Sequence, residues 1–246
     1  MRKLLFTLLV FVSFQLSAQK KINFKSSDGL EITADLYVQH SVEAPIIILF
    51  HQAGWSRGEY VEIAPKLNKL GYNCIAIDQR SGGEINGVLN ETHKRAKEQK
   101  KGTQYTDAEM DIIAAIQYMK SSFPNAKKYI VWGSSYSAAL ALKIAGDGGI
   151  EVDAVLSFAP GEYFESMGKS PNFIRESAAN ITIPTFITSA KAEKQNWWEI
   201  YESIPAIGKD YYLPKTDGQH GSRALWENFP DHKGYWLAVE EFLKSI

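Results

Sequence analysis

The chain has 246 residues, of which 45% are hydrophobic and 22% charged, and its net charge at neutral pH is −1. This composition is that of a globular protein, and the 12% of aromatic residues excludes a wholly disordered chain. A charge balance so close to neutral gives no reason to expect a nucleic-acid partner. The single cysteine excludes an internal disulfide and a Cys-based zinc site.

Residues 1–18 have the pattern of a secretory signal peptide. Arg2 and Lys3 give a positive start, an apolar run follows, and Ser17 and Ala18 are small enough for cleavage. The run is shorter than the roughly 20 apolar residues of a membrane span, and no cysteine follows it for lipid attachment. We therefore expect a periplasmic or secreted protein, with no stable membrane span after cleavage and one domain over residues 19–246. The alternative interpretation is an uncleaved anchor.

The rest of the chain alternates between predicted strands and helices. Alternating side chains on both sides of Asp28-Gly29 predict a hairpin over residues 21–26 and 30–38. Apolar runs predict buried strands at residues 46–50, 74–77, 129–132, 154–158 and 185–188, followed by a last strand at 210–213. Helical spacing and end signals predict helices at residues 59–70, 106–119, 137–145 and 235–244. This order favours an α/β fold with a mostly parallel sheet, helices on both faces and an N-terminal antiparallel hairpin.

Residues 81–105 are the most irregular stretch. They are longer than a connection without secondary structure usually is. They also leave the carboxyl end of a predicted strand, which is where open α/β sheets bind ligands. We therefore expect this stretch to be a functional or mobile loop, and the candidate lid of a shallow site.

The densest motif is Gly-Ser-Ser-Tyr-Ser at residues 133–137, between a buried strand and a helix of small residues. It is G-x-S-x-G with Ser137 in place of the last glycine, and such a turn exposes its central serine at the helix N-terminus. The motif predicts Ser135 as a nucleophile and the Tyr136 amide as an oxyanion donor. Two alternatives remain: Ser134 as the nucleophile in a shifted register, and serines that only cap the helix.

The strand order, this turn, a histidine-containing loop after the first buried strand and a late histidine resemble the α/β-hydrolase fold. Within that fold, the chain most resembles the dienelactone hydrolase-like group, from about residue 22 to the C-terminus. The resemblance implies a three-layer α/β-hydrolase fold and a catalytic base after the last strand. His220 lies there between two glycines, in Gly-Gln-His-Gly, and His232 is the weaker candidate.

The resemblance also implies an acid just after the strand at residues 185–188. Glu193 is the carboxylate in that loop, where aspartate is the commoner residue. Two alternative acids remain open. Glu162 follows the preceding strand, at a position that some members of the fold use, and Asp217 lies three residues before His220.

For the second oxyanion donor, the resemblance implies the amide two residues after His51, which is that of Ala53, with Gln52 as the alternative. His51 itself is expected to brace this loop. Trp55, Tyr136 and Tyr163 lie on loops at the same sheet edge and are candidates, with Gln52, for lining the substrate site.

Together these patterns predict an exported serine hydrolase that cleaves a small carboxylic ester, or a similar acyl bond, through an acyl-enzyme. Ser135, His220 and Glu193 form the predicted triad, and the chemistry needs neither a metal nor an organic cofactor. A peptidase or a lactonase would use the same groups. A non-catalytic binding protein that keeps the fold is a further hypothesis, and the sequence predicts no particular oligomeric state.

Overall fold

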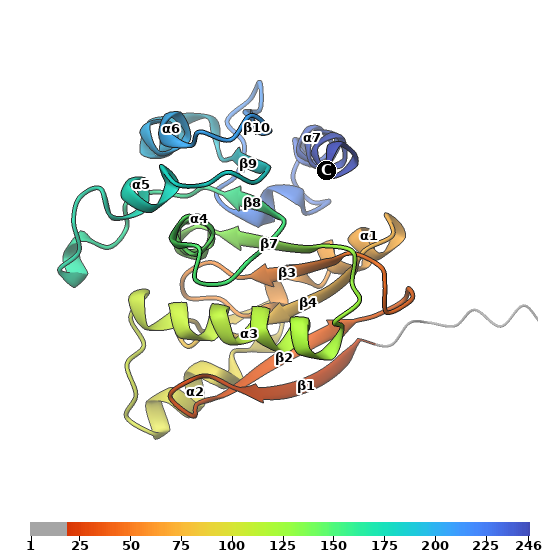
Figure 1. The fold of residues 1–246 in the computed structure, drawn as a ribbon, viewed down its shortest axis with the longest axis vertical. Helices are drawn as coiled ribbons and strands as arrows, with labels where there is room; N and C mark the ends of the chain where they lie inside the picture. The colour runs from red at the N-terminus through yellow and green to blue at the C-terminus, as the bar shows by residue number, and fades with distance from the viewer. Residues whose placement is uncertain (1–18) are drawn as a thin grey trace, which may run out of the picture.

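A computed structural model describes residues 19–246, so the predicted signal peptide lies outside the described residues. One eight-stranded sheet runs through the molecule (Figure 1). Its strands are β1 (Lys20–Lys25), β2 (Glu31–Tyr37), β3 (Ile46–Phe50), β4 (Asn73–Ile77), β7 (Tyr129–Ser134), β8 (Ala154–Phe158), β9 (Thr185–Thr188) and β10 (Lys209–Tyr212).

The strand order is β1-β2-β4-β3-β7-β8-β9-β10, which Figure 1 shows stacked from bottom to top. The β1–β2 hairpin and the β2–β4 pair are antiparallel, whereas every pair from β4 to β10 is parallel. The predicted fold class is therefore confirmed, including the N-terminal hairpin. The central strands β3, β4, β7, β8, β9 and β10 all run in the same direction. The loops that follow them therefore leave from one edge of the sheet.

Helices cover both faces of the sheet, which gives the three layers. One face packs against α1 (Ile63–Lys69) and α7 (His232–Ser245). The other packs against α3 (Glu109–Ser122), α4 (Tyr136–Asp147), α5 (Phe173–Ala178) and α6 (Lys194–Ser203). Strand β3 shows why its sequence is continuously apolar: Ile46, Ile48 and Phe50 enter one core, while Ile47 and Leu49 enter the other.

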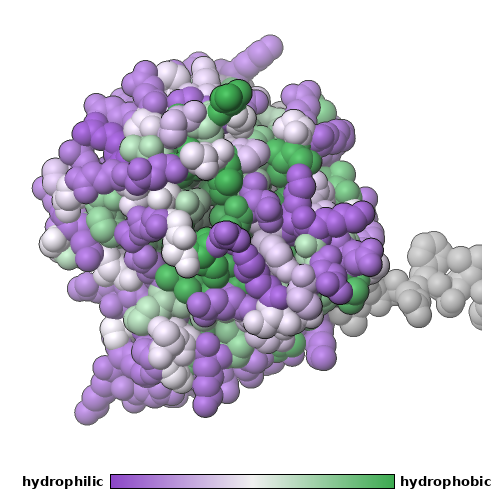
Figure 2. Space-filling view, viewed as in Figure 1, coloured by the Kyte–Doolittle hydropathy of each residue, from purple (hydrophilic) through white to green (hydrophobic). Residues whose placement is uncertain are grey.

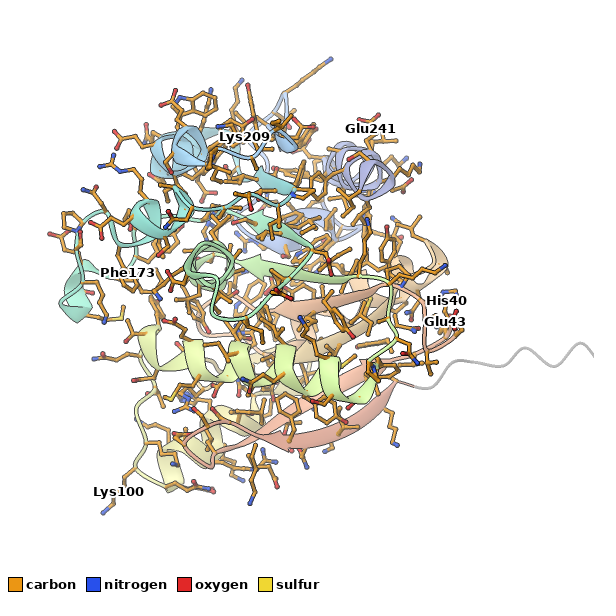
Figure 3. All side chains as sticks on the ribbon, viewed as in Figure 1. His40, Glu43, Lys100, Phe173, Lys209 and Glu241 are labelled. Atoms are coloured by element: carbon orange, nitrogen blue, oxygen red, sulfur yellow. The ribbon has the colours of Figure 1, made fainter. Side chains whose placement is uncertain are left out.

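The expectation of an irregular loop at residues 81–105 was wrong. The segment forms a small hairpin, β5 (Glu84–Ile85) with β6 (Val88–Leu89), and then the helix α2 (Glu91–Glu98). Its strands are too short to show a periodicity, and α2 buries only Thr92 and Ala96 and so lacks an apolar stripe. Lys100, just beyond α2, points into solvent at the lower left of Figure 3.

Asn90 fixes this segment to the sheet edge. Its Oδ1 caps α2 by accepting from the His93 amide at 2.7 Å. Its Nδ2 donates to the Gln79 carbonyl at 2.8 Å and to the Trp55 carbonyl at 3.1 Å. The segment therefore supports the loop after β3.

Figure 2 shows that the face of the molecule in this view is mostly hydrophilic, with hydrophobic residues gathered in a band through its middle. Within residues 19–246, no helix combines the length and the apolar character needed to cross a bilayer.

Candidate active site

The turn between β7 and α4 holds Ser135 in a strained backbone conformation. Its φ is 60° and its ψ −122°, a region that residues other than glycine rarely adopt. Two residues earlier, a Cβ on Gly133 would lie 2.4 Å from the Ala138 Cα, so only glycine fits there. The strand thus reaches its sharp turn directly under the helix, which is the geometry of a nucleophile elbow.

Ser137 shows why the last glycine of the motif is dispensable here. Its Oγ lies 2.8 Å from the Phe50 carbonyl and 2.9 Å from the Ser134 carbonyl, so its one proton has two acceptors. The same oxygen accepts from the Ser134 amide at 2.9 Å. The hydroxyl therefore links α4 to the ends of both β3 and β7.

Ser134 is fully buried, and its hydroxyl is already engaged. Its Oγ donates to Glu59 Oε1 at 2.7 Å and accepts from the Ser222 amide at 2.9 Å. A shifted register with Ser134 as the nucleophile therefore does not fit the structure. Helix capping also fails as the explanation of these serines, because Ser135 occupies the N-cap position without a side-chain cap bond.

The structure brings His220 and Glu193 together. His220 Nδ1 lies 2.6 Å from Glu193 Oε1, and both side chains are partly exposed. Glu193 ends the 3₁₀ turn η4 (Lys191–Glu193) after β9, and His220 lies in the loop after β10. A carboxylate at this nitrogen holds the proton on Nδ1 and leaves Nε2 as the basic nitrogen.

The two alternative acids have other contacts. Glu162 accepts from the Ile174 and Arg175 amides, at 2.9 Å each, and so occupies the N-terminus of α5. Asp217 contributes its backbone carbonyl, which accepts from the Lys191 amide at 2.8 Å. Of the three predicted carboxylates, Glu193 is the one that contacts His220.

The other histidines have different contacts or positions, and His93 Nδ1 bonds to the Arg80 carbonyl at 2.6 Å. His232 Nδ1 bonds to the Phe229 carbonyl at 2.7 Å, where α7 begins. His40 is on the right of Figure 3, whereas the β3 and β7 arrows in Figure 1 point left. It therefore lies at the sheet end opposite the elbow.

His51 braces the loop after β3, as expected. Its Nε2 accepts from the Gln79 amide at 3.0 Å, so the proton is on Nδ1, which donates to the Gln52 carbonyl at 2.8 Å. Burial lowers the pKa of His51 to about 4, which keeps the ring neutral at pH 7.

The same loop distinguishes the two predicted oxyanion donors. The Gln52 amide donates to Glu59 Oε2 at 2.8 Å, and the Gln52 side chain donates to Glu59 Oε1 at 3.3 Å. Because both groups are engaged, Gln52 does not fit the donor role, and Ala53 remains the candidate. On the other side, the Tyr136 amide belongs to the first turn of α4, where helix amides lack an intrahelical acceptor.

The three aromatic residues that were predicted to line the substrate site have different surroundings. Tyr163 lies beside Ser135: burial raises the pKa of Tyr163, and the Ser135 hydroxyl opposes this shift. Trp55 stacks on Trp226 with ring centroids 5.4 Å apart. For Tyr136 the expectation was wrong, because its ring is 1% exposed and stacks under Tyr105.

Two buried residues of the site were missed from the sequence. Glu59 lies under the elbow. Tyr235, on α7, donates its hydroxyl to the Ser189 carbonyl at 3.0 Å and accepts from the Gln219 amide at 3.4 Å. It thereby joins the loop of Glu193 to the loop of His220. No local sequence pattern marks either residue, since each contacts a distant part of the chain.

Among the described residues, no group of three or more His, Cys, Asp and Glu side chains is arranged to hold a metal ion.

Comparison with known proteins places the chain in a family. Residues 42–165, from just before β3 to just beyond β8, match the model of the serine aminopeptidase S33 family. The chain belongs to this family. It thus has the α/β-hydrolase fold, and the matched residues include both the elbow and the loop after β3.

Solved structures of similar fold include two small hydrolases. The Pyrococcus furiosus esterase Pf2001 superposes with a TM-score of 0.71 at 20% identity, covering 93% of this chain and 92% of its own. The dienelactone hydrolase of Anabaena variabilis gives a TM-score of 0.71 at 14% identity, covering 93% and 97%. The predicted resemblance to the dienelactone hydrolase-like group is confirmed.

A curated relative is the thiohydrolase apmlB of Arthrinium phaeospermum, 28% identical over 178 residues, which are 68% of this chain. The match spans about half of that relative, 54% of its length.

The contacts of Ser137 generate a test of stability. Ser137→Ala leaves the Phe50 carbonyl and the Ser134 amide without this buried partner, which costs about 2 kcal/mol. The melting temperature should therefore fall by roughly 4–8 °C. Ser137→Gly, which restores the consensus motif, should be less stable still, by about 1 kcal/mol, because glycine disfavours the helix. Thermal unfolding followed by circular dichroism measures both, and a glycine variant as stable as the parent would contradict this role.

Proposed function

We propose that the protein is an exported serine hydrolase that cleaves a small carboxylic ester, or a similar acyl bond, through Ser135, His220 and Glu193. The observation that carries the proposal is the strained backbone of Ser135, with its positive φ, at the N-terminus of α4. Such strain costs about 1–3 kcal/mol and persists where function requires it. The His220–Glu193 contact of 2.6 Å supports the assignment of base and acid.

In the proposed reaction, the Ser135 Oγ attacks the substrate carbonyl while His220 Nε2 takes its proton. The amides of Tyr136 and Ala53 donate to the oxyanion that forms. The tetrahedral intermediate collapses, His220 returns the proton to the departing alcohol, and an acyl-Ser135 ester remains. Water, deprotonated by His220, then releases the acid and restores Ser135. Throughout, Glu193 stabilises the protonated imidazole through Nδ1.

The esterase, dienelactone hydrolase and thiohydrolase similarities support an acyl bond to oxygen or sulfur as the target. The description of the family favours a second candidate, an aminopeptidase that uses the same triad. An assay panel of short acyl esters, a lactone, a thioester and an aminoacyl amide separates these possibilities by their kcat/KM values.

The nucleophile is tested with a phosphonylating serine probe. The parent and Ser134→Ala should both be labelled, because the Ser134 hydroxyl is buried and only supports the turn, although loss of its contacts should slow the reaction. Ser135→Ala should not be labelled, and intact mass spectrometry measures the adduct. Absence of labelling in the folded parent protein would favour the non-catalytic binding protein instead.

Glu193→Gln tests the acid. The amide retains the shape of the side chain but not the charge that stabilises the imidazolium, so kcat should fall by roughly 10³–10⁴-fold. Glu162→Gln is the matched control, since it makes the same change in a carboxylate that caps α5, and its kcat should stay close to that of the parent. The reverse pattern would make Glu162 the acid.

Export rests on the pattern of residues 1–18. If the full-length chain is expressed in a bacterial host, the mature form should begin near Gln19 and be found outside the cytoplasm. Mass spectrometry of the N-terminal peptide after cell fractionation checks this, and a protein that keeps Met1 and stays with the membrane would instead indicate an uncleaved anchor.

A further inference from the structure

Glu59 is a fully buried carboxylate in the 3₁₀ turn η1 (Arg57–Tyr60), directly after the loop that carries Ala53. The other buried carboxylates in the described chain are paired with arginine. Asp35 and Asp78 bind Arg57, and Asp111 binds Arg80. Within residues 19–246, Glu59 has no lysine or arginine partner. A buried carboxylate without a cation is costly and calls for an explanation.

The partners of Glu59 are neutral donors that belong to the site. Oε2 accepts from the Gln52 amide at 2.8 Å, and Oε1 accepts from the Ser134 hydroxyl at 2.7 Å. The Ser134 oxygen accepts in turn from the Ser222 amide at 2.9 Å. One carboxylate thus connects the residue before Ala53, the residue before Ser135 and a residue two after His220.

Two further hydrogen bonds hold this turn, one through the backbone carbonyl of Glu59 and one through the side-chain hydroxyl of Tyr60. The Glu59 carbonyl accepts from Trp226 Nε1 at 2.9 Å, and the Tyr60 hydroxyl donates to the Phe50 carbonyl at 2.6 Å. The η1 turn therefore has little freedom to move, and the position of the Glu59 carboxylate is fixed by the backbone that carries it. Burial raises the pKa of Glu59 to about 7, and the hydrogen bonds from Ser134 and Gln52 oppose that shift.

We propose that Glu59 is a positioning residue of this hydrolase: its carboxylate holds the amide of Ala53, the elbow and the His220 loop in mutual register. The inference rests on the proposed function. Glu59 does not touch the substrate in this scheme. It acts by fixing Gln52, whose peptide is joined to Ala53, and by fixing Ser134, which is joined to Ser135.

A carboxylate suits this task better than an amide does. Above its raised pKa of about 7 the group is ionised, so its two oxygens accept several hydrogen bonds at once, and charge-assisted bonds are stronger than neutral ones. Glutamine in its place keeps one oxygen to accept from the Gln52 amide. Its NH₂ group would then replace Oε1, where the Ser134 hydroxyl and the Gln52 side chain both donate, so that donor would face donor. Leucine has a similar volume and removes every hydrogen bond of the side chain.

The experiment compares steady-state kinetics of the parent, Glu59→Gln, Glu59→Leu and the control Glu162→Gln on the best ester found in the panel. Glu162 accepts two backbone amides, as a carboxylate outside the triad, and so matches the chemical change. Each protein is first melted, and rates are measured well below the lowest melting temperature so that only folded protein is compared.

A positioning role predicts that Glu59→Gln lowers kcat by about 10–100-fold with KM within about threefold, because a misplaced oxyanion donor weakens the transition state more than the bound substrate. Glu59→Leu should be slower still, and Glu162→Gln should match the parent. If Glu59→Leu does not fold, the Glu59→Gln result decides alone.

The inference is overturned if Glu59→Gln keeps the parent's kcat, or if its kcat and KM change no differently from those of Glu162→Gln. A parent protein that hydrolyses no substrate and takes up no serine probe would overturn the proposed function itself, and this inference with it. An active parent with an unaffected Glu59→Gln variant overturns only the role of Glu59.

Discussion

The sharp turn from β7 into α4 is the constraint on which the rest of the site depends. It holds Ser135 at a positive φ, which is unfavourable in isolation, and the surrounding structure has to impose it. The close approach of Gly133 to Ala138 and the contact of Ser137 with the Phe50 carbonyl do so from either side. Since every residue of β7 is buried, the strand has no freedom to relax the turn. The position of the Ser135 hydroxyl, on a residue that is only 9% exposed, is thus set by buried packing.

The buried and partly buried carboxylates of this fold differ in their partners and therefore in their roles. Where they pair with arginine, as Asp78 does with Arg57, they fix the turns that leave the sheet. Glu193 is paired with a histidine and is partly exposed to solvent. Glu59 has only neutral hydrogen-bond donors as partners. The surroundings of each carboxylate, rather than its residue type, separate structural groups from those that bear on the site.

The sequence was sufficient for features that are encoded locally. Continuous apolar runs predicted the central strands, and the order of Ser135, Glu193 and His220 with the hydrolase resemblance predicted a contact that the structure shows. It was insufficient where an element has no apolar stripe. The charged sequence of α2 lacks the helical spacing of apolar residues by which a helix is predicted. It also failed where a residue acts at a distance. Glu59 meets Ser134 across 75 positions, and Tyr235 meets Ser189 across 46, so neither contact leaves a trace in spacing.

The family match ends at residue 165, within the single eight-stranded sheet of the structure. The elbow and the loop after β3 lie before it, whereas Glu193 and His220 both lie beyond it. The two portions are joined near the site by the β8–β9 strand pair and by side-chain hydrogen bonds, among them the bond from the Ser222 amide to Ser134. Because Ser134 also binds Glu59, and Glu59 binds the Gln52 amide, the loop of His220 and the loop after β3 are tied to the same buried carboxylate.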